Sequence, residues 1–125
     1  MIICIDFDGT IVEHEYPSIG KPVPGAIETM ASLIRNGHRI VLFTMRSGEK
    51  LQEAVDYINS QGVDLYGVNK NPTQTNWTDS PKAYGHLYID DAALGCPLVV
   101  PSVGRPFVDW SGVKSYFVNE GLLLE

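Results

Sequence analysis

Short apolar runs rich in β-branched residues alternate along this chain with segments whose apolar residues recur at helical spacing. Such runs are typical of strands buried on both faces. They cover residues 2–5, 40–43, 65–68 and 87–89, with a further candidate at 98–100. Alternating strands and helices predict an α/β fold, a parallel sheet with right-handed crossovers and helices on both faces. The 125 residues are expected to form a single domain.

Three segments are predicted to be helical from their apolar spacing and their capping residues. The first covers residues 25–36, with Pro24 at a position that helices favour for their first residue. The second follows Ser47, which can cap it, and the third begins at Ser111. The apolar side of the third is expected to contain Val113, Tyr116 and Phe117.

Polar side chains stand where three of the predicted strands end, namely Asp6, Thr44 and the Asp90-Asp91 pair. Ligands of parallel sheets gather at the carboxyl ends of the strands. Three separate stretches of the chain would therefore deliver polar groups to one edge of the sheet. This convergence predicts a functional site at that edge.

The residues at this edge suit phosphoryl transfer, which needs a nucleophile, neutralisation of phosphate oxygens and a proton for the leaving oxygen. Asp6 can be the nucleophile, because a carboxylate can form an aspartyl phosphate. Asp8 can act as general acid and then as base. Thr44 offers a hydroxyl group and Lys82 a cation to the phosphate.

Several carboxylates around a dianionic substrate repel it and one another unless a divalent cation lies among them. Mg²⁺ fits, because it prefers oxygen ligands and keeps a substrate phosphate oxygen in its shell. The candidate ligands are Asp6, Asp8 through a backbone carbonyl near it, Asp90 and Asp91. The spacing leaves open which residue of the acidic pair binds directly.

Three further residues are candidates for substrate binding. Gly9 and Thr10 belong to the turn that follows the first strand. Arg46 follows the second strand and could reach a substrate phosphate, although an exposed arginine at a helix entry is an equally good interpretation.

Charge and cysteine content exclude some classes of function. Nine Lys and Arg residues against fifteen Asp and Glu give a net charge of −6, which disfavours binding to a nucleic acid backbone. The two cysteines are interpreted as packing residues rather than as a disulfide or a zinc site.

The apolar N-terminal run is too short for a signal peptide or a membrane span, so a cytoplasmic location is expected. A phosphorylated small molecule is the expected partner. The sequence leaves open whether the protein forms a homodimer.

In chain order, the sequence carries an Asp-x-Asp-Gly-Thr turn, a threonine, a lysine and an acidic pair, at residues 6–10, 44, 82 and 90–91. This set resembles the four ordered motifs of the haloacid dehalogenase (HAD) superfamily of phosphohydrolases. The resemblance implies a Rossmann-like fold, magnesium dependence and an aspartyl-phosphate intermediate, with Asp6 as nucleophile and Asp8 as acid and base. Lys82 matches the motif lysine, with Lys70 as a competitor.

The short segments between the motifs resemble the capless branch of the superfamily, which has no separate cap domain. The loops over residues 12–23 and 69–81 are then expected to line the entrance. His14, Tyr16 and Trp77 are expected to influence substrate preference from there.

Two other classes of protein compete with a phosphatase. A receiver-like signalling module also uses aspartates, a threonine, a lysine and magnesium, but it places its acidic pair first, whereas here the pair comes last. A HAD-like protein that binds a partner without turnover is the second alternative, although every motif position is filled.

Overall fold

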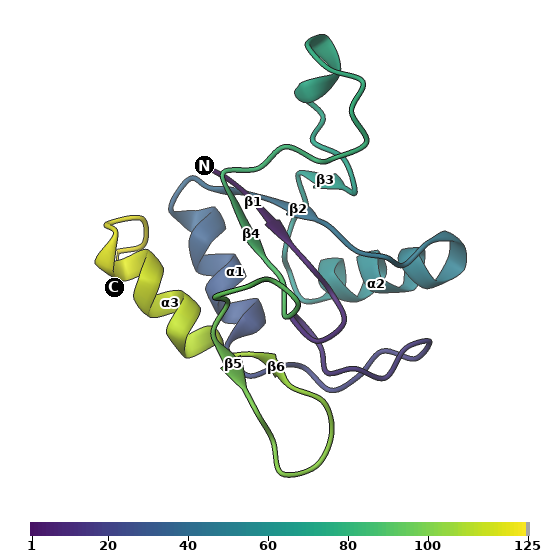
Figure 1. Cartoon of the computed structure of the whole chain (residues 1–125). Coiled ribbons are helices and arrows are strands. Elements are labelled where there is room, and N and C mark those ends of the chain that lie inside the picture. Colours follow the sequence, from purple (N-terminus) through teal and green to yellow (C-terminus); the bar gives the residue numbers. More distant parts are fainter. Residues whose placement is uncertain (125) are drawn as a thin grey trace.

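The structure, a computed structural model, describes residues 1–124 (Figure 1). Its main sheet contains four parallel strands in the order β3-β2-β1-β4. They are β1 (Ile2–Ile5), β2 (Arg39–Leu42), β3 (Gly67–Val68) and β4 (Leu87–Ile89). The predicted parallel α/β sheet is confirmed, although the third strand begins two residues later than predicted.

The three α-helices lie close to their predicted positions, as α1 (Ala26–Arg35), α2 (Gly48–Ser60) and α3 (Trp110–Asn119). The prediction for Pro24 is wrong, because the cap of α1 is Gly25, whose left-handed φ of 84° places Pro24 before the helix. The carboxylate of Asp109 caps α3 by accepting from the backbone of Ser111 and Gly112, so this helix starts at Trp110.

The predicted placement of helices on both faces of the sheet is wrong for the described residues. Side chains alternate along a strand, and Ile3 of β1 and Ile40 of β2 point to the same face. Buried residues of all three helices join these side chains in a single hydrophobic core, among them Met30, Ala54 and Phe117. Helices α1, α2 and α3 therefore cover one face together.

The opposite face of the sheet is covered by the connection between β3 and β4. Cys4 and Val41 point to this face and pack against Ala83 of the connection. This segment contains η1 (Gln74–Asn76), a short 3₁₀ helix, and projects at the top of Figure 1. Burial raises the pKa of the Cys4 thiol to about 11, which agrees with its prediction as a packing residue.

The candidate strand at residues 98–100 does not join the main sheet. It forms β5 (Leu98–Val99), which pairs antiparallel with β6 (Phe107–Val108) in a hairpin. In Figure 1 this hairpin lies at the bottom, on the same side of the molecule as the loop over residues 12–23. The segment that contains η1 lies at the opposite end.

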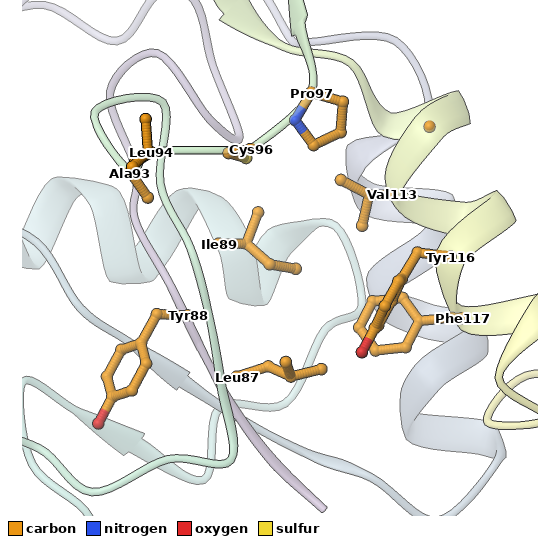
Figure 2. A pocket seen from close by; sticks show the side chains of 12 residues that line it. Leu87, Tyr88, Ile89, Ala93, Leu94, Cys96, Pro97, Val113, Tyr116 and Phe117 are labelled. Carbon is orange, nitrogen blue, oxygen red and sulfur yellow. The ribbon is translucent and has the colours of Figure 1, made fainter.

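An apolar groove of about 270 Å³ separates β4 from α3. Figure 2 shows Leu87 and Ile89 pointing toward Val113 and Phe117, whereas Tyr88 points to the other face of the sheet. Within residues 1–124, none of the helices combines the length and the apolar character that a bilayer span requires.

The burial of Phe117 of α3 in the core leads to a prediction about stability. Phe117 is 1% exposed and Tyr116 is 48% exposed. Phe117→Ala should lower the free energy of unfolding by about 3–5 kcal/mol, because it removes a ring from the packed core. Tyr116→Ala is the matched control and should cost about 1 kcal/mol or less. Urea unfolding of both variants measures the difference, and equal losses would contradict the packing described for α3.

Candidate active site

Three carboxylates converge where β1 and β4 end. The backbone N–H of Asp6 donates to the carbonyl of Ile89 at 2.9 Å, so the pairing of the strands continues to the first aspartate. One carboxylate oxygen from each of Asp6, Asp90 and Asp91 lies within 4.8 Å of the others. The structure thus brings together the aspartates that the sequence placed at two strand ends.

Thr10 connects two of these aspartates. Its hydroxyl group donates to Oδ2 of Asp6 at 3.2 Å and accepts from the backbone N–H of Asp91 at 3.3 Å. Its side chain is fully buried, and its carbonyl accepts from Nε1 of Trp110 at 2.7 Å. Thr10, predicted to bind substrate, is placed instead to fix Asp6 relative to Asp91.

Gly9 allows the turn after β1 to approach the acidic pair closely. Its φ of 83° is in the left-handed region, and a Cβ at this position would overlap the imidazole of His14 and lie 2.6 Å from Oδ2 of Asp91. Nε2 of His14 and Oδ2 of Asp91 are 2.8 Å apart. A side chain at residue 9 would therefore displace this contact.

The crowding of carboxylates shifts the ionisation of Asp6. Burial, followed by the nearby charge of Asp90, raises the pKa of Asp6 to about 8, although a backbone hydrogen bond from Phe7 opposes the shift. All three clustered groups offer carboxylate oxygens, which hard divalent cations prefer. The cluster could hold such a cation, which would offset the mutual repulsion.

Asp8 lies beside this cluster and is bound by Arg46. Nε and Nη2 of Arg46 donate to the two oxygens of Asp8, each at 2.8 Å. The carboxylate of Asp8 is thus outside the group of carboxylates that could share a cation, and the prediction for Asp8 concerned a backbone carbonyl near it. Its backbone carbonyl remains the expected ligand.

Arg46 is 2% exposed and has no free donor for a substrate. Besides Asp8, it donates from Nη1 to the carbonyls of Pro17 and Lys50, both at 3.3 Å, and from Nη2 to that of Ser18 at 2.8 Å. These contacts use all five guanidinium N–H groups. The hydrogen bonds to Asp8 raise the pKa of Arg46. In this structure Arg46 is therefore not placed as a phosphate ligand, and it is not an exposed arginine at the helix entry, so both interpretations are wrong.

The same arginine fixes the loop over residues 12–23. Its guanidinium lies 5.0 Å from the ring centre of Tyr16 on one side and 5.0 Å from that of Phe7 on the other. Because it also binds two carbonyls of this loop, it holds the loop against the turn that carries Asp8.

Thr44 follows β2, as predicted, and its position is set by Asn69, which sequence reasoning missed. Oδ1 of Asn69 accepts from the backbone N–H of Thr44 at 2.7 Å. The hydroxyl oxygen of Thr44 accepts from the backbone N–H of Arg46 at 3.1 Å. Asn69 directly follows β3, so its place at a strand end was a signal that could have identified it.

A cavity of about 500 Å³ opens over these strand ends. Its lining consists of Asp6, Asp8, His14, Tyr16, Thr44, Met45, Arg46, Asp90, Asp91, Ala92 and Arg105. The loop over residues 12–23 lines the entrance as predicted, through His14 and Tyr16. Arg105 comes from the hairpin loop between β5 and β6, and sequence reasoning missed it.

The second predicted entrance loop, residues 69–81, does not reach the cavity. Trp77 packs edge-on against Tyr84, with 5.7 Å between the ring centres, in a different pocket. Lys82 lines that same pocket, and its Nζ lies 5.5 Å from the ring centre of Tyr88, which points to the face opposite the helices. Lys70 lines two further pockets on this connection. The structure therefore brings neither predicted lysine into the lining of the aspartate cavity.

The contacts of Arg46 lead to a prediction about stability and about the loop over residues 12–23. Arg46→Met should lower the free energy of unfolding by about 3 kcal/mol or more, because it leaves Asp8 and three carbonyls without their partner. Lys50→Met is the control, since Lys50 and Glu53 form an exposed pair at 3.4 Å, and its cost should stay near 0.5 kcal/mol. Hydrogen exchange should accelerate at residues 13–21 in Arg46→Met alone. Unchanged exchange in this loop would contradict the role described for Arg46.

Comparisons with known proteins add one relative. No protein-family model matches the sequence, and a search of curated proteins finds no match. A solved structure, described as that of a conserved protein coded by a locus of Bacteroides thetaiotaomicron, is 37% identical in sequence with a TM-score of 0.79. The match covers 97% of this chain and 91% of that chain. The chain therefore belongs to the same family as this conserved Bacteroides thetaiotaomicron protein.

Proposed function

We propose that this protein is a magnesium-dependent phosphatase of the HAD superfamily, in its capless branch, that hydrolyses a phosphate monoester through an aspartyl phosphate. The observation that carries the proposal is the cluster of Asp6, Asp90 and Asp91 within 4.8 Å at the ends of β1 and β4, with Asp8 lining the same cavity. A nucleophile, an acid and a set of cation ligands are the groups that this reaction requires.

In the first step, a carboxylate oxygen of Asp6 attacks the phosphorus atom, and the bond to the ester oxygen breaks. Thr10 holds Oδ2 of Asp6, which fixes the direction of the attacking group. The protonated carboxyl group of Asp8 gives its proton to the departing oxygen, so the product leaves as a neutral alcohol. Thr44, at the end of β2, offers its hydroxyl group to a phosphate oxygen.

In the second step, water attacks the phosphorus atom of the aspartyl phosphate, and the bond to Asp6 breaks. Asp8, now ionised, takes a proton from this water and returns to its starting state. Arg46 donates to both oxygens of Asp8, so this residue positions the acid and base rather than touching the substrate, and one of the two contacts has to open before Asp8 carries the proton.

Mg²⁺, when bound, neutralises charge on the transferring phosphoryl group. Asp6, the backbone carbonyl of Asp8, and Asp90 or Asp91 are the residues that would hold it. His14 contacts Oδ2 of Asp91 and thereby orients this carboxylate. A phosphorylated small molecule remains the expected substrate, because a cavity of about 500 Å³ has the size of small-molecule sites. The cytoplasm remains the expected location.

The first test concerns the nucleophile and the cation. Asp6→Asn and treatment of the parent protein with a chelator should each lower phosphate release from an aryl phosphate by on the order of a thousandfold or more. Re-addition of Mg²⁺ should restore the chelated parent and leave Asp6→Asn inactive. Asp64→Asn, at an exposed aspartate outside the lining of the cavity, is the matched control. Undiminished release after either treatment would refute the mechanism.

The second test concerns Asp8. Asp8→Asn should slow esters with poor leaving groups roughly a hundredfold more than nitroaryl esters, because only poor leaving groups need a proton. The substitution also disturbs the pair with Arg46, so the informative quantity is the ratio of kcat/KM across the ester series. An equal loss for alkyl and nitroaryl esters would remove Asp8 from the role of acid.

A further inference from the structure

The proposed reaction leaves one requirement without a residue, namely a side-chain cation for the substrate phosphate. A dianionic phosphate would enter a cavity lined by Asp6, Asp8, Asp90 and Asp91. Arg46 neutralises Asp8 and has no remaining donor, so three clustered carboxylates still face the substrate. One divalent cation does not balance these three carboxylates together with a phosphate dianion.

Arg105 has the properties that this missing cation requires. It lines the cavity together with the aspartates, and it is exposed. Among the described residues, its guanidinium has no hydrogen-bond or ion-pair partner. It therefore retains five N–H donors in the planar arrangement that matches phosphate oxygens.

The hairpin that carries Arg105 is fixed against the aspartates at both of its ends. On the β6 side, the backbone N–H of Val108 donates to the carbonyl of Gly9 at 3.0 Å, within the turn after β1. On the β5 side, the backbone N–H of Cys96 donates to Ala93 at 3.2 Å, and that of Ala93 donates to Asp90 at 3.0 Å. The pairing of β5 with β6 joins the two ends. The base of the hairpin is thus joined to the segments that carry the aspartates, and Arg105 lines the cavity from the loop of this hairpin.

We propose that Arg105 binds the phosphate group of the substrate and takes the place that the sequence motifs assign to Lys82. The inference rests on the proposed function and extends it, because the cation comes from a hairpin that follows the last motif. An arginine at this position can bind two phosphate oxygens at once, whereas a lysine would act as a point charge.

The experiment compares Arg105→Ala, Arg105→Lys and Lys82→Ala with the parent protein. Arg39→Ala is the matched control, since its guanidinium lies over the ring of Tyr66, at the start of β2 and outside the cavity. Calorimetry measures the binding of inorganic phosphate in the presence of Mg²⁺, which does not depend on turnover. A second assay measures kcat/KM for an aryl phosphate.

Arg105→Ala should weaken phosphate binding roughly tenfold or more and lower kcat/KM by a similar factor, with Arg105→Lys in between. Parent-like phosphate affinity in Arg105→Ala, a loss in Lys82→Ala in its place, or no phosphate binding by the parent protein would each overturn the assignment. If the parent binds phosphate through Arg105 but hydrolyses no ester, the proposed phosphatase activity fails while the anion site stands.

Discussion

Mutual repulsion among three aspartates at the ends of β1 and β4 is the constraint on which the rest of the site depends. Asp6, Asp90 and Asp91 offer oxygens within 4.8 Å of one another, and burial adds to the cost of ionising Asp6. The fold holds these groups together through the pairing of the two strands and through Thr10, which bonds to Asp6 and to the backbone of Asp91. A cation among the carboxylates would offset this repulsion.

The fourth carboxylate of the cavity, that of Asp8, has a side-chain cation as its partner instead of another carboxylate. Asp8 is paired with Arg46, whose buried guanidinium also binds carbonyls of the loop over residues 12–23. Loss of this arginine would affect the position of Asp8 and the conformation of the loop together. The wall of the cavity and its candidate acid are therefore coupled through one side chain.

The covering of the sheet determines which segments can reach the site. All three α-helices pack on one face, and the connection between β3 and β4 covers the other. That connection projects away from the loop over residues 12–23 and from the hairpin between β5 and β6 (Figure 1). Lys82 and Trp77 belong to the connection and do not line the cavity, whereas His14, Tyr16 and Arg105 do.

The sequence by itself determined the parallel strands, the positions of the helices and the convergence of Asp6, Thr44 and the acidic pair at one edge. Hydrophobic periodicity reports which residues are buried, and the carboxyl ends of parallel strands must meet at the same edge.

Only the tertiary structure decided the partner of Arg46, the face on which Lys82 lies and the approach of Arg105 to the aspartates. These features depend on contacts between segments far apart in the chain. A residue's local pattern carries no information about which distant carbonyl or carboxylate its side chain will meet. The turn after Ile89 and the antiparallel pairing of β5 with β6 determine where the hairpin lies. They thereby also determine the position of Arg105, which lines the cavity.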